Sequence, residues 1–138
     1  MTNETLLHRW FEEVWNQGRD SSIDELMAED AVYHGIVQPS TEEVHGPAGF
    51  RAFHQQFRTA FPDIHFTIED ALVDGDKIAV RCVVSAKHTG PGVMPAPTNR
   101  TINISGMVFA RVKDGKLIEG WNNFDFLSLY KQLGMQLT

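Results

Sequence analysis

The sequence predicts an α+β protein in which helices cover one face of a strongly curved antiparallel sheet. Apolar residues recur at helical spacing at the start of the chain and again over residues 46–62, which indicates amphipathic helices. From residue 64 onward apolar residues alternate with polar ones, as in strands with one buried face. In residues 116–134 the alternation changes to helical spacing, so a last strand is followed by a closing helix. Because helices and strands are segregated along the chain, the α+β class is favoured.

A stripe of apolar side chains predicts a first helix over residues 4–17, which needs a core to pack against. The stripe consists of Leu6, Leu7, Trp10, Phe11, Val14 and Trp15. Thr2 or Asn3 is placed to cap the start of this helix, and Gly18 is placed to cap its end.

Two short elements are predicted before the next long helix. Ser22 and Glu25 have the spacing of a capping box, which predicts a short helix through Met27. Residues 31–36 are predicted to form a first, short strand, and residues 37–46 a polar loop.

A longer helix is predicted from Gly46-Pro47 to Pro62, since proline is tolerated in the first turn of a helix and ends one elsewhere. Its apolar face consists of Phe50, Phe53, Phe57 and Phe61. His54 lies beside this face, either as a half-buried structural residue or as a residue that contacts a ligand.

Four strands are predicted in the second half of the chain, over residues 64–73, 78–88, 100–112 and 116–124. Asp74-Gly75 and Asp114-Gly115 mark two hairpin turns, because Asp-Gly readily takes positive φ. Residues 89–99, which contain three prolines and two glycines, are predicted to be a loop.

The last three strands share an apolar row that we expect to face the core. The row consists of the even-numbered residues in 78–86, 102–110 and 118–124. Gly106 and Gly120 lie in facing rows and fit places where the sheet bends sharply. Helices packed on such a sheet would leave a conical cavity between the sheet and the first helix.

Length and charge narrow the class of protein. The 138 residues predict a single domain, 1–138, and the net charge of −6 disfavours nucleic acid and anionic membranes as partners. Cys82 is the one cysteine, so no internal disulfide is expected, which suits a reducing cytoplasm. The amino end shows no basic segment followed by an apolar run, so we expect a cytoplasmic protein without a signal peptide or membrane span.

The sequence predicts neither a metal site nor a bound cofactor. The six histidines form no HxH, HxxxH or HExxH pattern, and a single cysteine makes no thiolate cluster. A glycine-rich phosphate loop and a Gly-x-Ser-x-Gly nucleophile elbow are also missing from the sequence.

Several stretches of the chain carry a resemblance to a known family. They are Gly-Pro-Ala-Gly-Phe-Arg-Ala-Phe (46–53), Ala-Phe-Pro-Asp-Ile-His-Phe-Thr-Ile-Glu-Asp (60–70), His-Thr-Gly (88–90), Pro-Ala-Pro-Thr-Asn-Arg (95–100), Asp-Gly-Lys-Leu-Ile-Glu (114–119) and Gln-Leu-Gly (132–134). In these stretches and in the order of its elements, the chain resembles the SnoaL-like polyketide cyclases, also described as ester cyclases, of the nuclear-transport-factor-like α+β cone superfamily. The resemblance implies a cystatin-like α+β barrel whose curved sheet wraps around the amino-terminal helices and a hydrophobic pocket.

The resemblance also implies a cofactor-free reaction and a position for its acid/base. Family members that close polyketide rings by aldol chemistry use an aspartate on the last strand, which falls on Asn122 here. The family's usual pocket histidine on the preceding strand falls near Val108. Because an amide takes up no proton at neutral pH, this mechanism does not carry over intact.

His34, His88, Asn122 and Asp125 are the candidate catalytic residues. Each of the two histidines is either structural or catalytic. For a catalytic role we expect the histidine to reach the cavity mouth, because a histidine side chain can exchange a proton near neutral pH. Asp125 is either the N-cap of the closing helix or the carboxylate that serves the site beside Asn122. Asn122 itself either holds a substrate carbonyl or is a hydrogen-bonded core residue.

Aromatic and apolar residues that we expect around the cavity are the candidate ligand-binding residues. They are Trp15, Tyr33, His54, Phe57, Val108 and Phe124. Tyr33 and Trp15 have flat rings that stack well on a flat ligand, although Trp15 also fits core packing.

Two classes of function stay open at this point. The first is a cofactor-independent cyclase, lyase or isomerase that acts on a small hydrophobic carbonyl compound by acid/base chemistry. The second is a non-catalytic small-molecule-binding protein on the same fold, which Asn122 in place of aspartate favours. In either case we expect a homodimer through the opposite face of the sheet, where Met107, Phe109 and Trp121 present large apolar groups.

Overall fold

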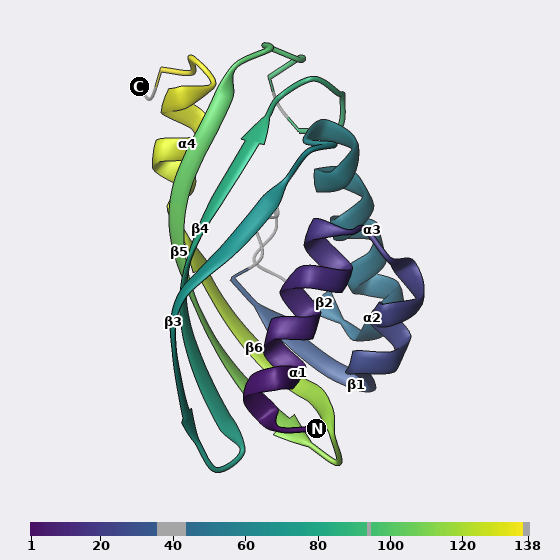
Figure 1. Cartoon of the computed structure of the whole chain (residues 1–138). Helices are drawn as coiled ribbons and strands as arrows, with labels where there is room; N and C mark the ends of the chain where they lie inside the picture. The colour runs from purple at the N-terminus through teal and green to yellow at the C-terminus, as the bar shows by residue number, and fades with distance from the viewer. Residues whose placement is uncertain (36–43, 94, 137–138) are drawn as a thin grey trace.

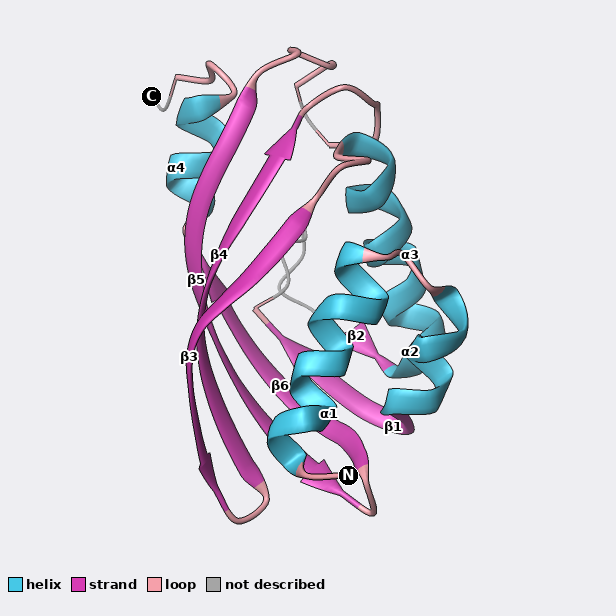
Figure 2. Cartoon of the chain, viewed as in Figure 1, coloured by secondary structure: helices cyan, strands magenta, loops and turns pink. Residues whose placement is uncertain are grey.

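The computed structural model describes residues 1–35, 44–93 and 95–136, and it confirms the α+β class (Figures 1 and 2). The helical elements are α1 (Asn3–Arg9), the π-helix η1 (Trp10–Asn16), α2 (Asp20–Leu26), α3 (Gly46–Ala60) and α4 (Phe126–Gln132). The strands are β1 (Met27–His34), β2 (Val44–His45), β3 (His65–Asp74), β4 (Lys77–Lys87), β5 (Thr101–Lys113) and β6 (Lys116–Phe124).

The strands form one curved, six-stranded open sheet in the order β2-β1-β6-β5-β4-β3. β1 and β6 run parallel, and the other neighbouring strands are antiparallel. Figure 1 shows α1, α2 and α3 together on the concave side of this sheet, while α4 follows β6 at the far end and packs on β5. The helices therefore cover the hydrophobic row of the long strands, as predicted.

The first helix lies where the apolar stripe predicts it, but its second half has a different hydrogen-bond pattern. Thr2 caps the start, because its Oγ1 accepts a hydrogen bond from the Thr5 N–H at 3.1 Å. In η1 the hydrogen bonds reach back five residues, and the Gln17 N–H donates to the Glu12 carbonyl at 2.9 Å. The periodicity of the sequence did not predict this π-helical segment.

The second helix begins earlier than the capping-box spacing predicts, and the first strand follows it at once. α2 starts at Asp20 and ends at Leu26, and Met27 is already extended. Ser22 does not cap the helix, because it is buried inside it and its hydroxyl donates to Glu13 Oε1 at 2.7 Å. Residues 36–43 lie outside the described residues. They include the predicted strand end at Ile36 and most of the predicted polar loop 37–46.

The long helix α3 has the predicted start and apolar face and ends at Ala60, just before Phe61 and Pro62. Its buried side chains include Phe50, Phe53 and Phe57. His54 is more deeply buried than expected: its Nε2 donates to the Val14 carbonyl at 2.7 Å. This hydrogen bond joins α3 to η1.

The even-numbered rows of β4 and β5 face the core, as predicted. On β6 the prediction holds from Gly120 to Phe124, which pair with the inward row of β5. It is wrong at the start of the strand, where Leu117 is buried in place of Ile118. A β-bulge shifts the register there, so that Val112 faces Leu117 while Arg111 faces Glu119.

The two inward glycines make room for aromatic rings. A Cβ on Gly120 would lie 3.1 Å from Cε1 of Tyr33, and a Cβ on Gly106 would collide with the ring of Phe124. Close approach of a neighbouring side chain is therefore the reason for glycine at both positions.

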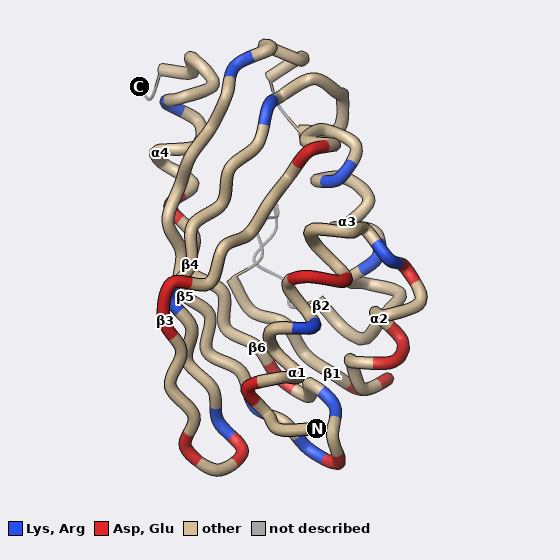
Figure 3. The backbone as a smooth tube through the Cα atoms, viewed as in Figure 1, with Lys and Arg blue, Asp and Glu red and all other residues tan. Residues whose placement is uncertain are grey.

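Figure 3 shows acidic and basic residues interspersed over the helices and the strand turns. None of the helices in the described ranges is both long and apolar enough to cross a membrane.

Candidate functional site

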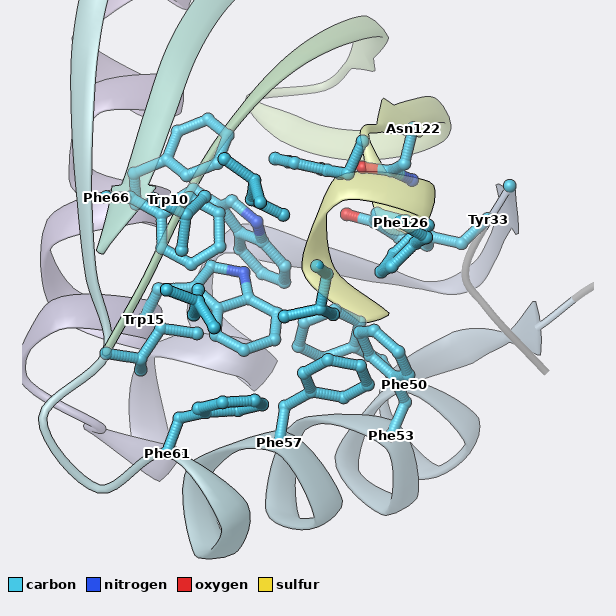
Figure 4. Close-up of a pocket in the computed structure, with 18 residues that line it drawn as sticks. Trp10, Trp15, Tyr33, Phe50, Phe53, Phe57, Phe61, Phe66, Asn122 and Phe126 are labelled. Atoms are coloured by element: carbon cyan, nitrogen blue, oxygen red, sulfur yellow. The ribbon is translucent and has the colours of Figure 1, made fainter. Parts of the chain in front are cut away.

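A cavity lies between η1, α3 and the inner face of the sheet (Figure 4). It has a volume of about 60 Å³, and 18 residues line it. The lining consists of Trp10, Phe11, Trp15, Tyr33, Gly35, Phe50, Phe53, Phe57, Phe61, Ile64, Phe66, Val84, Ile102, Ile104, Asn122, Phe124, Phe126 and Leu129. No lysine, arginine, histidine, aspartate or glutamate is among these described lining residues.

Phe50 is the centre of the aromatic cluster that forms the helical wall. Its ring lies 4.9 Å from the ring of Trp10, 5.5 Å from Tyr33 and 5.8 Å from Trp15, measured between centroids. The tilted and edge-on arrangements are those that aromatic pairs prefer. Such a wall presents flat apolar ring surfaces to the cavity.

The cavity has an open end and a deep end. Gly35 is exposed, and Asn122, Phe124 and Phe126 are half-buried, so these residues surround the open end. Trp15 and its neighbours on α3 are buried. Asn122 thus lies at the mouth of the cavity.

Two polar side chains lie on one side of the cavity, Asn122 at the open end and Tyr33 in a buried position. The Nδ2 of Asn122 donates to the His34 carbonyl at 3.0 Å, which leaves its Oδ1 and its second N–H for a ligand. Burial raises the pKa of Tyr33 far above its ordinary value, so the phenol stays protonated and able to donate. Its hydroxyl makes no hydrogen bond to any residue in the described ranges. Figure 4 shows Tyr33 and Asn122 on the same side of the cavity.

His34 does not reach the cavity, contrary to expectation. Because Tyr33 points inward on β1, the next side chain points outward, where the His34 ring stacks on Trp121 at 5.2 Å. His34 Nε2 lies 2.8 Å from Glu119 Oε2, and Arg111 donates to the other carboxylate oxygen at 2.8 Å. The hydrogen bond with His34, with a smaller effect of Arg111, lowers the pKa of Glu119.

Asp125 is the N-cap of α4, which is one of the two alternatives that the sequence left open. It accepts hydrogen bonds from the backbone N–H of Ser128 at 3.0 Å and from its hydroxyl at 2.7 Å. These hydrogen bonds lower the pKa of the carboxyl. The side chain is exposed and does not line the cavity.

His88 is fully buried just after β4 and lies against Phe61, which itself lines the cavity. Its Nδ1 accepts a hydrogen bond from the Thr98 N–H at 3.3 Å, so the proton of the neutral ring is on Nε2. That Nε2 has no hydrogen-bond partner among the described residues. His88 is therefore separated from the cavity by one aromatic ring.

Four of the six candidate ligand-binding residues line the cavity, namely Trp15, Tyr33, Phe57 and Phe124. His54 faces the backbone of η1, and Val108 is buried in the sheet beside Asn122 without lining the cavity. Sequence reasoning did not single out Trp10 and Phe50 as site residues, because both were assigned to apolar helix faces and such faces also fit simple core packing. Within the described ranges no three metal-binding side chains converge.

Comparison with known proteins places the chain in a family. A profile of the SnoaL-like polyketide cyclases matches residues 5–133, and the chain belongs to this family. The match spans the helices that carry the aromatic wall and the strand that carries Asn122. No curated protein shows significant similarity to the chain.

Solved structures share the whole fold. The candidate polyketide cyclase IdmH from Streptomyces antibioticus is 27% identical, with a TM-score of 0.85 over 98% of this chain and 100% of its own. A candidate polyketide cyclase from Bacillus cereus is 29% identical, with a TM-score of 0.79 over 96% of this chain and 80% of its own. AclR from Streptomyces galilaeus, a candidate hydroxylase, is 24% identical with a TM-score of 0.83 over 98% of this chain and 86% of its own, and shows likeness of fold alone.

Proposed function

We propose that the chain is a cofactor-independent cyclase-type enzyme that acts on a small, uncharged, largely apolar carbonyl compound. The observation that carries the proposal is the pair of polar side chains on one side of a cavity whose described lining holds no charged residue. Tyr33 and Asn122 both retain unused hydrogen-bonding capacity there. Membership of the polyketide cyclase family supports carbonyl chemistry at this position.

In an aldol ring closure the carbon next to one carbonyl loses a proton, and negative charge develops on the carbonyl oxygen. The Tyr33 O–H and the Asn122 N–H donate to that oxygen, and a single preorganised donor of this kind is worth roughly 10²–10³ in rate. The enolate carbon then bonds to a second carbonyl carbon, whose oxygen takes up a proton. Water at the open end carries the proton, because the described lining supplies no carboxylate or imidazole.

The volume of about 60 Å³ limits what enters without rearrangement. Ligand pockets usually measure roughly 300–1,000 Å³, so a ligand of more than a few atoms must displace lining side chains. Phe124 and Phe126 are half-buried at the open end, and every other aromatic ring of the described lining is buried.

Heptane-2,6-dione provides a direct test, because its aldol closure and loss of water give 3-methylcyclohex-2-enone with strong ultraviolet absorbance. We expect the protein to accelerate this reaction, and Tyr33→Phe and Asn122→Leu each to slow it by about tenfold or more. Tyr130→Phe is the matched control, since Tyr130 does not line the cavity. Equal rates in wild-type protein, the three variants and buffer would argue against a cyclase.

A non-catalytic binding protein is the second candidate, favoured by an amide at the family's acid/base position. Acetophenone that binds the cavity while heptane-2,6-dione is not turned over would support this candidate. Asn122→Asp then separates the two roles of this side chain. If Asn122 orients a substrate, the aspartate supplies a base and raises ring-closing activity, whereas a structural Asn122 leaves only a destabilised fold.

A further inference from the structure

The cavity contains two hydrogen-bond donors that the described chain does not use. Neither indole N–H, of Trp10 or of Trp15, makes a hydrogen bond to a residue in the described ranges. The described side chains contain two fully enclosed polar atoms without a partner, His88 Nε2 and Arg111 Nε. The indole nitrogens of Trp10 and Trp15 are not among them, so each retains some accessible surface. In Figure 4 both blue indole nitrogens lie near the middle of the cluster of rings.

The π-helical segment is what places these two side chains in one wall. In an α-helix, residues five apart point roughly 140° away from each other. In the π-helix η1 the hydrogen bonds span five residues, so Trp10 and Trp15 lie about one turn apart. Two side chains of α3 hold this backbone, since His54 donates to the Val14 carbonyl at 2.7 Å and Arg58 to the Trp15 carbonyl at 3.0 Å.

The polar groups of the lining are strongly biased toward donors. An indole N–H only donates, and the buried Tyr33 phenol stays protonated, while Asn122 Oδ1 is the one side-chain amide oxygen among the described lining residues. The lining also lacks charged side chains, so an ion would lose its hydration without compensation. A neutral molecule that supplies acceptors complements such a cavity.

We infer that the ligand is an uncharged, flat compound with two acceptor oxygens. One oxygen is held by Tyr33 and Asn122, and the other is held by the indole N–H groups of Trp10 and Trp15. A ketone, ester or lactone oxygen has the required chemistry. The inference rests on the proposed function and adds to it the second oxygen and the residues that select for it.

The test uses the indole N–H signals of the ¹⁵N-labelled wild-type protein. The probes are 1,4-diacetylbenzene, acetophenone and 1,4-diethylbenzene, which share a flat ring and differ in the number of carbonyl oxygens. We expect 1,4-diacetylbenzene to move the Trp10 and Trp15 N–H signals downfield, and 1,4-diethylbenzene to leave them without this shift. Trp121 is the internal control, because it lies on the outer face against His34.

Two variants measure what the second oxygen contributes. Trp10→Phe and Trp15→Phe keep a ring and remove the N–H, and each also assigns one indole signal. By calorimetry we expect the affected variant to bind 1,4-diacetylbenzene about threefold to tenfold more weakly, as for one hydrogen bond. Binding of 1,4-diethylbenzene to the same variant reports the loss of packing alone, and Trp121→Phe is the matched control.

The outcomes separate this inference from the proposed function. If 1,4-diacetylbenzene binds but moves the two indole signals no more than 1,4-diethylbenzene does, the second oxygen site is overturned and the carbonyl site at the mouth stands. If none of the three probes binds, the apolar carbonyl site is overturned, and the inference with it. The wild-type spectra decide between these results even if a tryptophan variant fails to fold.

Discussion

Glu13 is expected to link η1 and α2 in a way that depends on pH, and Glu13→Gln tests this link. The Glu13 carboxylate is 13% exposed and accepts hydrogen bonds from Arg9 and, at 2.7 Å, from Ser22 in α2. The hydrogen bond from Arg9 and then that from Ser22 lower the pKa of Glu13 from 4.5 to about 2. A carboxylate held in this way stabilises the fold only while it is ionised.

The size of the effect follows from the fall in pKa. A change from 4.5 to about 2 corresponds to about 3 kcal/mol, at 1.36 kcal/mol per pKa unit. The Arg9 side chain is 29% exposed, so solvent screening reduces this ceiling, and we expect about 1–2 kcal/mol at pH 7. Because the folded pKa is lowered, this stability is fully present above about pH 4.5 and is lost as the pH falls toward 2.

Thermal unfolding followed by circular dichroism at pH 7, 4.5, 3 and 2.5 measures the effect. We expect Glu13→Gln to lower the Tm at pH 7 by roughly 3–8 °C, and the gap to wild type to close toward pH 2.5. Glu25→Gln is the matched control, since Glu25 also contacts Arg9 but is 53% exposed. A gap between Glu13→Gln and wild type that is the same at pH 7 and pH 2.5, or no gap at pH 7, would refute the reasoning.

Three further predictions concern other parts of the molecule. Gly106→Ala should destabilise the fold by about 1–3 kcal/mol in urea unfolding, because its Cβ meets the Phe124 ring, whereas Gly115→Ala in a turn with open space reports backbone strain alone. Asp125→Ala should cost about 0.5–2 kcal/mol as a lost helix cap and leave acetophenone affinity unchanged; weaker binding would place Asp125 in the site. We propose that the outer sheet face forms a homodimer, because Met107 is 59% and Phe109 41% exposed. Sedimentation should give twice the chain mass for the wild type and the mass of a monomer for Phe109→Glu. A monomeric wild type would contradict the proposal.

The sequence predicted the sheet well where burial alone decides the pattern. On β4 and β5 one face is buried along the whole strand, so the alternation of apolar residues gave the correct inward row. On β6 the bulge places Leu117 in the inward row in place of Ile118. The sequence does not reveal this bulge, because Leu117 and Ile118 are both apolar and either could occupy the inward row. The same limit applies to η1, because an apolar stripe fits a helix with either hydrogen-bond pattern.

The sequence predicted the residues that line the cavity better than it predicted the positions of the candidate catalytic residues. Asn122, placed through the family resemblance, does line the cavity, and so do four of the predicted ligand-binding residues. His34 was misplaced because a short strand with mixed polarity does not show which of its residues faces inward. For Asp125 the choice between cap and site depended on the local direction of one side chain, and the hydrogen bonds to Ser128 set that direction.

Because of the π-helical segment, a deletion of one residue can change the shape of the cavity in a way that a single substitution cannot. Deleting one residue between Trp10 and Trp15 would allow the segment to return to α-helical hydrogen bonding and would change which side chains share its inner face. The sheet and α3 would keep their sequence, while the wall that faces a ligand would be exchanged in one step. Chains of this family that differ by one residue in the first helix should therefore differ in the ligands they accept more than their overall identity indicates.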